Sequence, residues 1–191
     1  METRTKIVLL MHPKEARRTK CTTGRLACLN LRNSEIICGL DFDSNPRLVS
    51  ILDDPANFTV LLYPGNDAVD LSSEDGSLDL PPGRRLVVLL VDATWSCSRS
   101  LLRANPGLLR LPIVQFKPRE PSRWIIKRQP AEYCLSTIES IHELLLALER
   151  CGLDSYQDKE RLLKVFAAMQ SYQLDRALSA SADRTHQLLA E

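Results

Sequence analysis

The stretch that decides the fold is RRLVVLLVDATWSCSRSLL, residues 84–102. Its run of Leu and Val has no polar alternation, which is typical of a strand covered on both faces in a parallel sheet flanked by helices. The run ends at Asp92, Thr94, Trp95 and Ser98, after which apolar residues resume at helical spacing. The stretch therefore predicts a central parallel strand followed directly by a helix.

Strands and helices alternate along the rest of the chain. The expected strands cover residues 5–11, 35–38, 58–62, 84–91 and 111–116. The expected helices cover residues 23–31, 46–54, 96–105, 136–150 and 158–178. Residues 66–83 are polar and rich in turn residues, so we expect an exposed loop there. The alternation predicts a single α/β domain with a mostly parallel sheet flanked by helices.

Length and composition exclude several classes of protein. The 191 residues suffice for one sizeable domain, and 44% hydrophobic with 26% charged residues exclude a disordered chain. No apolar run approaches the roughly 18 residues that span a bilayer, and the start, METRTKIVLL, lacks the layout of a signal peptide. We therefore expect a cytoplasmic protein that does not bind membranes.

Charge and cysteine spacing bear on partners and metals. The net charge of +1 gives no global attraction to nucleic acid, but KEARRTK (14–20) and KPREPSRWIIKR (117–128) concentrate positive charge. Such segments either contact phosphates or form solvated faces. The six cysteines include no CxxC pair and the three histidines are far apart in sequence. We therefore expect no metal site, and cysteines that serve as small core residues.

The carboxyl ends of parallel strands are where ligands bind in α/β sheets. Four expected strands end in polar or turn-forming groups, namely His12-Pro13, Tyr63-Pro64-Gly65, Asp92–Trp95 and the basic segment after residue 116. Convergence of these groups predicts one concave site. Thr94 or Ser96 can simply cap the following helix, which explains the hydroxyl groups without any ligand. Capping does not explain Trp95, whose indole needs either a core pocket or a flat ligand to cover it.

Three further features have an ordinary structural interpretation. Ser136 and Glu139 have the spacing of a capping box, although a helix start of this kind also presents free amides to an anionic ligand. His12 precedes a proline at a strand end and is expected to bond locally. His142 lies within an apolar helix and is expected in the core or at its boundary.

The sequence has no GxGxxG, Walker, HExxH or nucleophile-elbow motif. These absences argue against a nucleotide-dependent dehydrogenase, an NTPase, a zinc protease and an α/β-hydrolase.

Four segments in order resemble one known family. DATWSCS (92–98) resembles the D-x-T-W-x-x-S signature of DTW-domain proteins. Its companions are HPKEARRTKCTTGRLACLNL (12–31), YPGNDAVDL (63–71) and PSRWIIKRQPAEYCLSTIES (121–140). The resemblance covers roughly residues 5–150 and rests on the order of the four motifs, because each alone is weak. Cys21 stands where the family is expected to have a more polar residue.

The resemblance implies a fold and an activity. The chain is expected to be a single DTW domain over residues 1–191, with a core at about 5–150 and a helical extension at about 151–191. The implied fold is SPOUT-like with a deep trefoil knot, similar to that of the rRNA aminocarboxypropyltransferases. The implied reaction is transfer of the 3-amino-3-carboxypropyl group from S-adenosylmethionine to N3 of a tRNA uridine, which releases 5′-methylthioadenosine. The cysteine-rich, zinc-binding N-terminal segment of some members has no counterpart here, so no metal is carried over.

The resemblance also implies roles for individual residues. Asp92 and Trp95 are the expected catalytic residues, Asp92 to accept the N3 proton or orient the uridine and Trp95 to form an adjoining wall. The residues expected at the donor are Tyr63, Pro64, Asp92, Thr94, Ser98, Leu135, Ser136 and Thr137. The residues expected at tRNA phosphates are Arg17, Arg18, Arg25, Arg119, Arg123, Lys127 and Arg128.

Two other activities remain open from the sequence. One is a SPOUT-type RNA methyltransferase, which would transfer the methyl group of the same donor. The other is a catalytically silent RNA-binding protein that keeps the fold. The sequence specifies neither the uridine nor the tRNA that is modified, nor the oligomeric state, nor the role of the last helix.

Overall fold

The structure is a computed structural model that describes residues 1–18, 22–73, 76–126 and 134–188. Within these residues the chain forms a six-stranded parallel sheet with the strand order β2-β1-β5-β3-β6-β4. The strands are β1 (Lys6–Met11), β2 (Ser34–Cys38), β3 (Asn57–Leu62), β4 (Val69–Asp70), β5 (Arg85–Asp92) and β6 (Ile113–Gln115). The helices are α1 (Pro13–Arg18), α2 (Thr23–Asn30), α3 (Pro46–Leu52), α4 (Trp95–Ala104), α5 (Thr137–Arg150) and α6 (Arg161–Leu188), with a short 3-10 turn, η1 (Leu108–Arg110).

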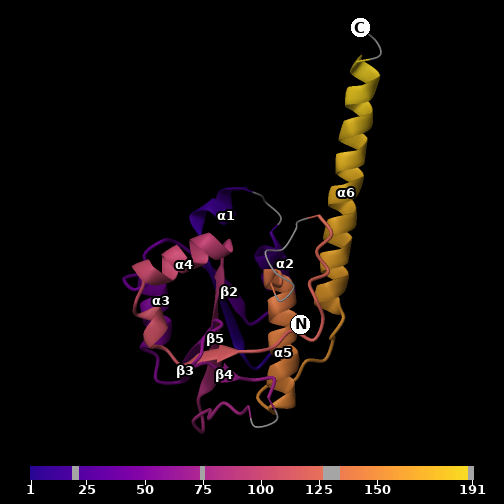
Figure 1. The fold of residues 1–191 in the computed structure, drawn as a ribbon. Coiled ribbons are helices and arrows are strands. Elements are labelled where there is room, and N and C mark those ends of the chain that lie inside the picture. Colours follow the sequence, from indigo (N-terminus) through magenta and orange to yellow (C-terminus); the bar gives the residue numbers. More distant parts are fainter. Residues whose placement is uncertain (19–21, 74–75, 127–133, 189–191) are drawn as a thin grey trace.

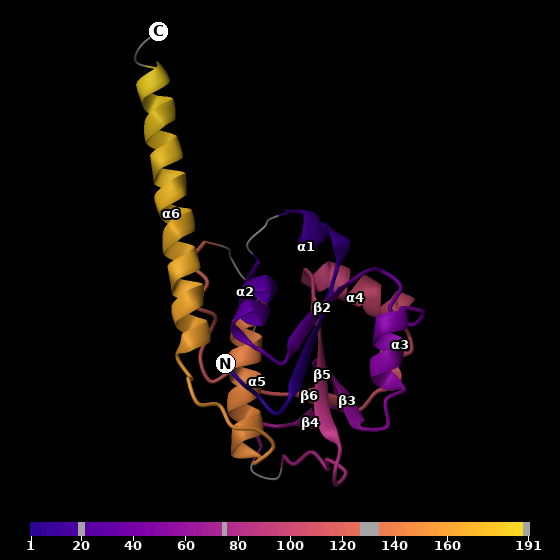
Figure 2. The same cartoon turned by 180° about the vertical axis from the view of Figure 1, so that it is seen from behind.

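Helices cover both faces of the sheet, as the apolar run in residues 84–91 predicts. Leu86, Val88 and Leu90 of β5 pack with α2, α5 and α6 on one face. Val87 and Leu89 pack with α3, α4 and η1 on the other. Figures 1 and 2 show the two helical layers from opposite sides. β5 lies between β1 and β3. Because side chains alternate between faces along a strand, β5 contributes side chains to both cores.

Local capping signals fix where the helices begin. Thr22, Asn45, Thr94 and Ser136 each accept a hydrogen bond from a backbone N–H of the helix that follows. Ser136 and the Glu139 side chain form the complete capping box that the sequence predicts. At its other end α5 stops before Gly152, whose φ of 70° is a left-handed conformation that favours glycine.

Two expectations near the strand ends are wrong. Residues 66–83 are not simply an exposed loop, because β4 lies within them and pairs with β6, while Leu71 and Leu78 are buried. A two-residue strand is too short to show a period of two. The chain after β1 forms α1, although no helix is expected there from the sequence. Its sequence, PKEARR, has no apolar face, but proline is well suited to the first position of a helix.

The last helix differs from its expected bounds and extends beyond the body of the protein. α6 begins at Arg161 instead of residue 158 and continues to Leu188 instead of ending near 178. Its first turns pack against the core through Leu162, Phe166 and Met169, and its later turns project past the sheet, as Figures 1 and 2 show. Among the described residues, no helix is long and apolar enough to cross a membrane.

Asn105 joins the end of α4 to the chain between β2 and α3. Its side-chain oxygen accepts hydrogen bonds from the backbone N–H groups of Phe42 (2.5 Å) and Asp43 (3.1 Å). Its amide nitrogen donates to the carbonyl groups of Leu40 and Leu101, each at 2.8 Å. The side chain is fully buried, so no water can replace these four bonds.

We expect Asn105→Ala to lower the free energy of unfolding by about 3 kcal/mol, since it leaves several buried backbone groups without a partner. Urea denaturation measures the change. Asn66→Ala, at an exposed position in the chain after β3, is the matched control and should change the value by less than about 0.5 kcal/mol. Equal effects of the two substitutions would contradict the role given to Asn105.

Candidate active site

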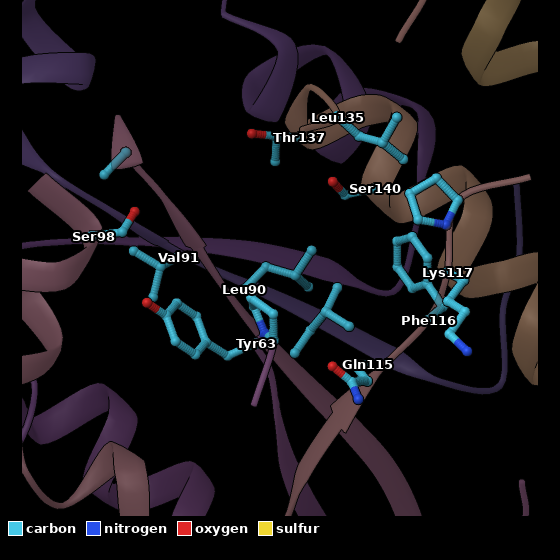
Figure 3. A pocket seen from close by; sticks show the side chains of 14 residues that line it. Tyr63, Leu90, Val91, Ser98, Gln115, Phe116, Lys117, Leu135, Thr137 and Ser140 are labelled. Carbon is cyan, nitrogen blue, oxygen red and sulfur yellow. The ribbon is translucent and has the colours of Figure 1, made fainter. Parts of the chain in front are cut away.

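A cavity of about 320 Å³ opens at the edge of the sheet where the parallel strands end. Figure 3 shows Tyr63, Leu90 and Val91, from the ends of β3 and β5, on one side and Leu135, Thr137 and Ser140, around the start of α5, on the other. The cavity is lined by Leu62, Tyr63, Pro64, Leu90, Val91, Ala93, Ser98, Gln115, Phe116, Lys117, Pro118, Leu135, Thr137 and Ser140. Three of the four strand ends predicted to converge, those after β3, β5 and β6, therefore meet at one concave site, whereas His12 and Pro13 do not line it.

The lining combines an apolar surface with a few polar groups. Leu62, Leu90 and Phe116 contribute the apolar part, which suits the face of a planar ring. Gln115 belongs to the polar part, and its side-chain oxygen accepts a hydrogen bond from the backbone N–H of Gly65 (3.3 Å). Lys117 adds a positive charge, and its ammonium lies 3.7 Å from Asp70. Such a lining fits a ligand with a flat ring and a charged polar end.

Asp92, the last residue of β5, has a buried carboxyl group beside this cavity. The residue is only 7% exposed. The hydroxyl group of Thr137 donates a hydrogen bond of 2.6 Å to Asp92 Oδ1. Because Thr137 is the first residue of α5 and itself lines the cavity, this bond links the end of the central strand to the cavity wall. Asp92 is thus held at the junction of the strand and the site.

Gly24 in the first turn of α2 packs directly against the same carboxyl group. A Cβ atom at this position would lie 2.2 Å from Asp92 Oδ2 and 2.8 Å from Asp92 Cγ. Those separations are far below van der Waals contact, so only glycine allows α2 to approach this closely. Three of the four sequence motifs, TGR, DATW and STIE, therefore meet at one carboxyl group.

The start of α4 confirms the capping interpretation of Thr94. Its hydroxyl group accepts from the Cys97 backbone N–H at 3.4 Å, and its carbonyl group accepts from the Ser98 N–H at 2.7 Å. Ser98 is buried and lines the cavity, whereas Thr94 faces a second, more open hollow with Lys14, Arg17 and Cys97. The side chain of Trp95 lies outside the described part of the structure, so its role stays a prediction.

Residues around the start of α5 divide into cap and cavity wall. Ser136 is buried, and its hydroxyl group donates to Glu139 Oε2 at 2.6 Å, so the structure places it in the capping box. Leu135 and Thr137 line the cavity, as do Tyr63 and Pro64. Five of the eight residues expected at the donor line the cavity, namely Tyr63, Pro64, Ser98, Leu135 and Thr137. Asp92 adjoins it through its bond to Thr137, whereas Thr94 and Ser136 act as helix caps.

The described arginines among those expected at tRNA phosphates have different neighbours. Arg119 pairs with Glu143 (3.3 Å) and Arg123 pairs with Glu120 (2.7 Å), both beside the cavity wall formed by α5. Arg25 donates to the carbonyl group of Ala16 (3.3 Å), and Arg17 lines the hollow beside α4. Lys127 and Arg128, as well as the side chain of Arg18, lie outside the described residues.

The cavity contains polar residues that sequence reasoning missed. Gln115 lies at the end of β6, where the general rule for strand ends could have identified it. Lys117 begins the basic segment that the sequence places at a strand end, but it is not singled out there. Ser140 lies one helical turn after Ser136, and that spacing could have placed it on the face that meets the cavity. Phe116 was treated only as the end of a strand, although its ring forms part of the apolar lining.

His12 and His142 have the structural roles expected of them. His12 accepts a hydrogen bond from the Lys14 backbone N–H through Nδ1 (3.0 Å), a local turn contact. His142 is buried in α5, and its Nδ1 lies 3.0 Å from the Tyr156 hydroxyl oxygen. Burial lowers the pKa of His142 below its ordinary value of 6.5 and raises the pKa of Tyr156, so both groups are neutral near pH 7.

No group of three or more His, Cys, Asp or Glu side chains among the described residues is placed to hold a metal ion. Two of the cysteines have the inert character expected of core thiols. Burial raises the pKa of Cys28 to about 11, and burial also raises the pKa of Cys151, whose thiol donates to the carbonyl group of Gly76 (3.2 Å). Thiols with such pKa values remain protonated at neutral pH and are poor nucleophiles.

The fold and site define a parallel α/β protein with a ligand cavity at the carboxyl edge of its sheet and the DATW turn beside it. The sequence profile of the DTW domain family matches residues 1–174, and the chain belongs to that family. No solved structure matches the chain significantly.

Curated relatives carry one shared name. The tRNA-uridine aminocarboxypropyltransferase 2 of Drosophila melanogaster is 32% identical over 88% of this chain and 64% of that protein. The proteins of the same name from Macaca fascicularis and Mus musculus are 30% and 33% identical, over 96% and 89% of this chain and 60% and 55% of those proteins. The chain thus spans less than two thirds of the length of these relatives.

We expect Gly24→Ala to lower the free energy of unfolding by about 1–3 kcal/mol, because the new methyl group displaces the Asp92 carboxyl group. Thermal or urea denaturation measures the loss. Gly39→Ala is the control, since the nearest atom to its new Cβ would be a Phe42 ring carbon at 3.8 Å, an ordinary van der Waals contact. Asp92→Ala should reduce the cost of Gly24→Ala, and a double-mutant cycle without coupling would contradict the contact.

The neutral His142 predicts how stability depends on pH. Its pKa is lower in the folded than in the unfolded protein, so the unfolded state binds more protons below about pH 6.5. The free energy of unfolding should therefore decrease as the pH falls through that value. Urea titrations at several pH values between 5 and 8 test this, with His142→Gln as the reference. The slope should be shallower in the variant, and an equal slope would exclude His142 as its source.

Proposed function

We propose that this protein transfers the 3-amino-3-carboxypropyl group of S-adenosylmethionine to N3 of a uridine in tRNA. The observation that carries the proposal is the meeting of three family motifs at the Asp92 carboxyl group, beside a cavity of suitable chemistry. The name of the curated relatives supports the reaction class and the acceptor. A tRNA acceptor also supports the cytoplasmic location that the sequence predicts.

The cavity suits the proposed donor in size and in lining. Its volume of about 320 Å³ lies within the range of small-molecule sites, which begins at roughly 300 Å³. The apolar surface from Leu62, Leu90 and Phe116 fits the adenine ring. Ser140, Gln115 and Lys117 supply hydrogen bonds and a positive charge for the ribose and for the amino acid carboxylate. Tyr63, Pro64, Ser98, Leu135 and Thr137, expected at the donor, belong to the same lining.

The reaction needs one bond to form and one to break in line. N3 of the uridine attacks the methionine Cγ, the Cγ–S bond breaks, and its electron pair neutralises the sulfonium as 5′-methylthioadenosine leaves. N3 also loses its proton, which Asp92 either accepts or directs by orienting the base. Thr137 holds one oxygen of Asp92 in place through the 2.6 Å hydrogen bond. Alignment of the three reacting atoms would supply much of the rate acceleration, so a modest base suffices.

The finer features of the fold belong to the same proposal. We infer a SPOUT-like chain path with a deep trefoil knot, in which the loops after β3, β5 and β6 form the donor site. The shared lining of the cavity by those loops and by the start of α5 supports this inference. We further infer one DTW domain across residues 1–191, with α6 as its C-terminal extension. Trp95 is proposed as a wall beside the reacting base.

The proposed reaction predicts which label enters RNA. Incubation with tRNA and donor labelled in the carboxyl group should give labelled tRNA, whereas donor labelled in the methyl group should not. Incorporation from the methyl label alone would establish a methyltransferase instead. tRNA binding without any donor binding, measured by calorimetry, would favour a catalytically silent RNA-binding protein.

Asp92→Asn should lower kcat by about 100-fold or more, because the amide keeps an oxygen acceptor for Thr137 but cannot take up the N3 proton. Single-turnover rates with saturating donor and tRNA separate the chemical step from binding. A normal rate in this variant would show that Asp92 only orients the substrate.

A further inference from the structure

The stretch that follows β6, residues 117–126, carries two exposed apolar side chains at its far end. Ile125 is 71% exposed and Ile126 is 40% exposed. We call residues 117–126 the basic segment, after its Lys117, Arg119 and Arg123. Adjacent exposed apolar side chains on one segment can form a small contact surface for a partner.

The start of α5 holds the middle of the basic segment. Glu139 is buried, and its carboxyl group completes the capping box with Ser136. The same carboxyl group also accepts from the Ser122 hydroxyl group (2.8 Å) and from the Arg123 backbone N–H (2.6 Å). One buried side chain therefore fixes both the helix start and the segment.

α6 holds the far end of the basic segment. Gln170 is only 4% exposed, and its side-chain oxygen accepts from the Ile125 N–H (2.7 Å) while its nitrogen donates to the Arg123 carbonyl group (3.1 Å). Between these contacts the Trp124 ring packs edge-on against Phe166, with centroids 5.4 Å apart. The backbone that carries the exposed Ile125 is thus held by hydrogen bonds to α5 and α6.

The held segment adjoins the proposed donor cavity. Lys117 and Pro118 line the cavity at the start of the segment. Glu139, which holds the middle of the segment, lies between the cavity residues Thr137 and Ser140. In Figure 1 the segment runs beside α6 toward the end of the molecule where the strands terminate. The held segment therefore runs from the cavity lining to the exposed isoleucines.

The chemistry of the proposed acceptor indicates which part of the substrate contacts Ile125 and Ile126. N3 of uridine carries the hydrogen of a Watson–Crick pair, so its alkylation requires an unpaired base. Unpaired bases expose apolar faces that proteins cover with apolar or aromatic side chains. The arginines of the segment are about half exposed and can contact the adjoining phosphates when they exchange their carboxylate partners.

We propose that Ile125 and Ile126 form the surface on which unpaired bases of the tRNA substrate pack, and that Gln170 of α6 is a positioning residue for this surface. The inference rests on the proposed function and adds to it a recognition surface and a role for the last helix. Donor binding should not depend on either residue, because neither lines the cavity.

The test compares variants of the full chain in tRNA binding and in turnover. Ile125→Ala and Gln170→Ala should each raise the Kd and KM for tRNA by about tenfold, with kcat at saturating tRNA and the Kd of the donor unchanged. Ile125→Ala should also leave the salt dependence of tRNA binding unchanged, since it removes no charge. The matched controls are Leu29→Ala, at an 82% exposed leucine near the end of α2, and Gln173→Ala on α6.

Each outcome separates the inference from the function on which it rests. Wild-type affinity for tRNA in Ile125→Ala would overturn the surface, and an unchanged KM in a folded Gln170→Ala would overturn the positioning role. Because Ile125 is exposed, its substitution should not alter the melting temperature, which keeps the test decisive if Gln170→Ala is unstable. If the wild-type protein modifies tRNA and the variants bind and modify it equally well, only this inference is disproved. A wild-type protein that neither binds nor modifies tRNA disproves the proposed function as well.

Discussion

The burial of the Asp92 carboxyl group is the constraint on which the arrangement of the site depends. A buried polar group needs a hydrogen-bond partner, and Thr137 supplies one at the first residue of α5. The start of α5 therefore cannot move away from the end of β5. At the other carboxyl oxygen, α2 can approach only because Gly24 has no side chain. One residue thus sets the positions of two helices relative to the central strand.

Much of this architecture could be predicted because its signals are local. The uninterrupted apolar run of residues 84–91 indicates burial on both faces, and β5 does contribute to two cores. Asn45-Pro46 and Ser136 with Glu139 identify helix starts from only a few adjacent residues. The site followed from a general rule, since Tyr63, Ser98 and Thr137 reach one cavity once parallel strands are assumed.

The remaining features depend on contacts between distant parts of the chain. The approach of Gly24 to Asp92 has no periodic signature, because the two residues belong to different elements. The charge of Arg119 and Arg123 suggested phosphate contacts, but nothing in the sequence indicates that Glu143 and Glu120 lie within reach. Glu139 was identified as a capping residue, yet its additional bonds to Ser122 and Arg123 require the fold.

The shortness of β4 has a consequence for the behaviour of the protein at high concentration. An uncovered strand at the margin of a sheet offers free N–H and C=O groups on which another chain can align, and this leads to aggregation. β4 pairs through only Val69 and Asp70, so that margin offers too few groups for a stable intermolecular ladder. At the other margin Glu35 of β2 is engaged by Lys6 and Arg47, and these charges oppose the addition of an apolar strand. The sheet therefore resists growth at both of its described margins.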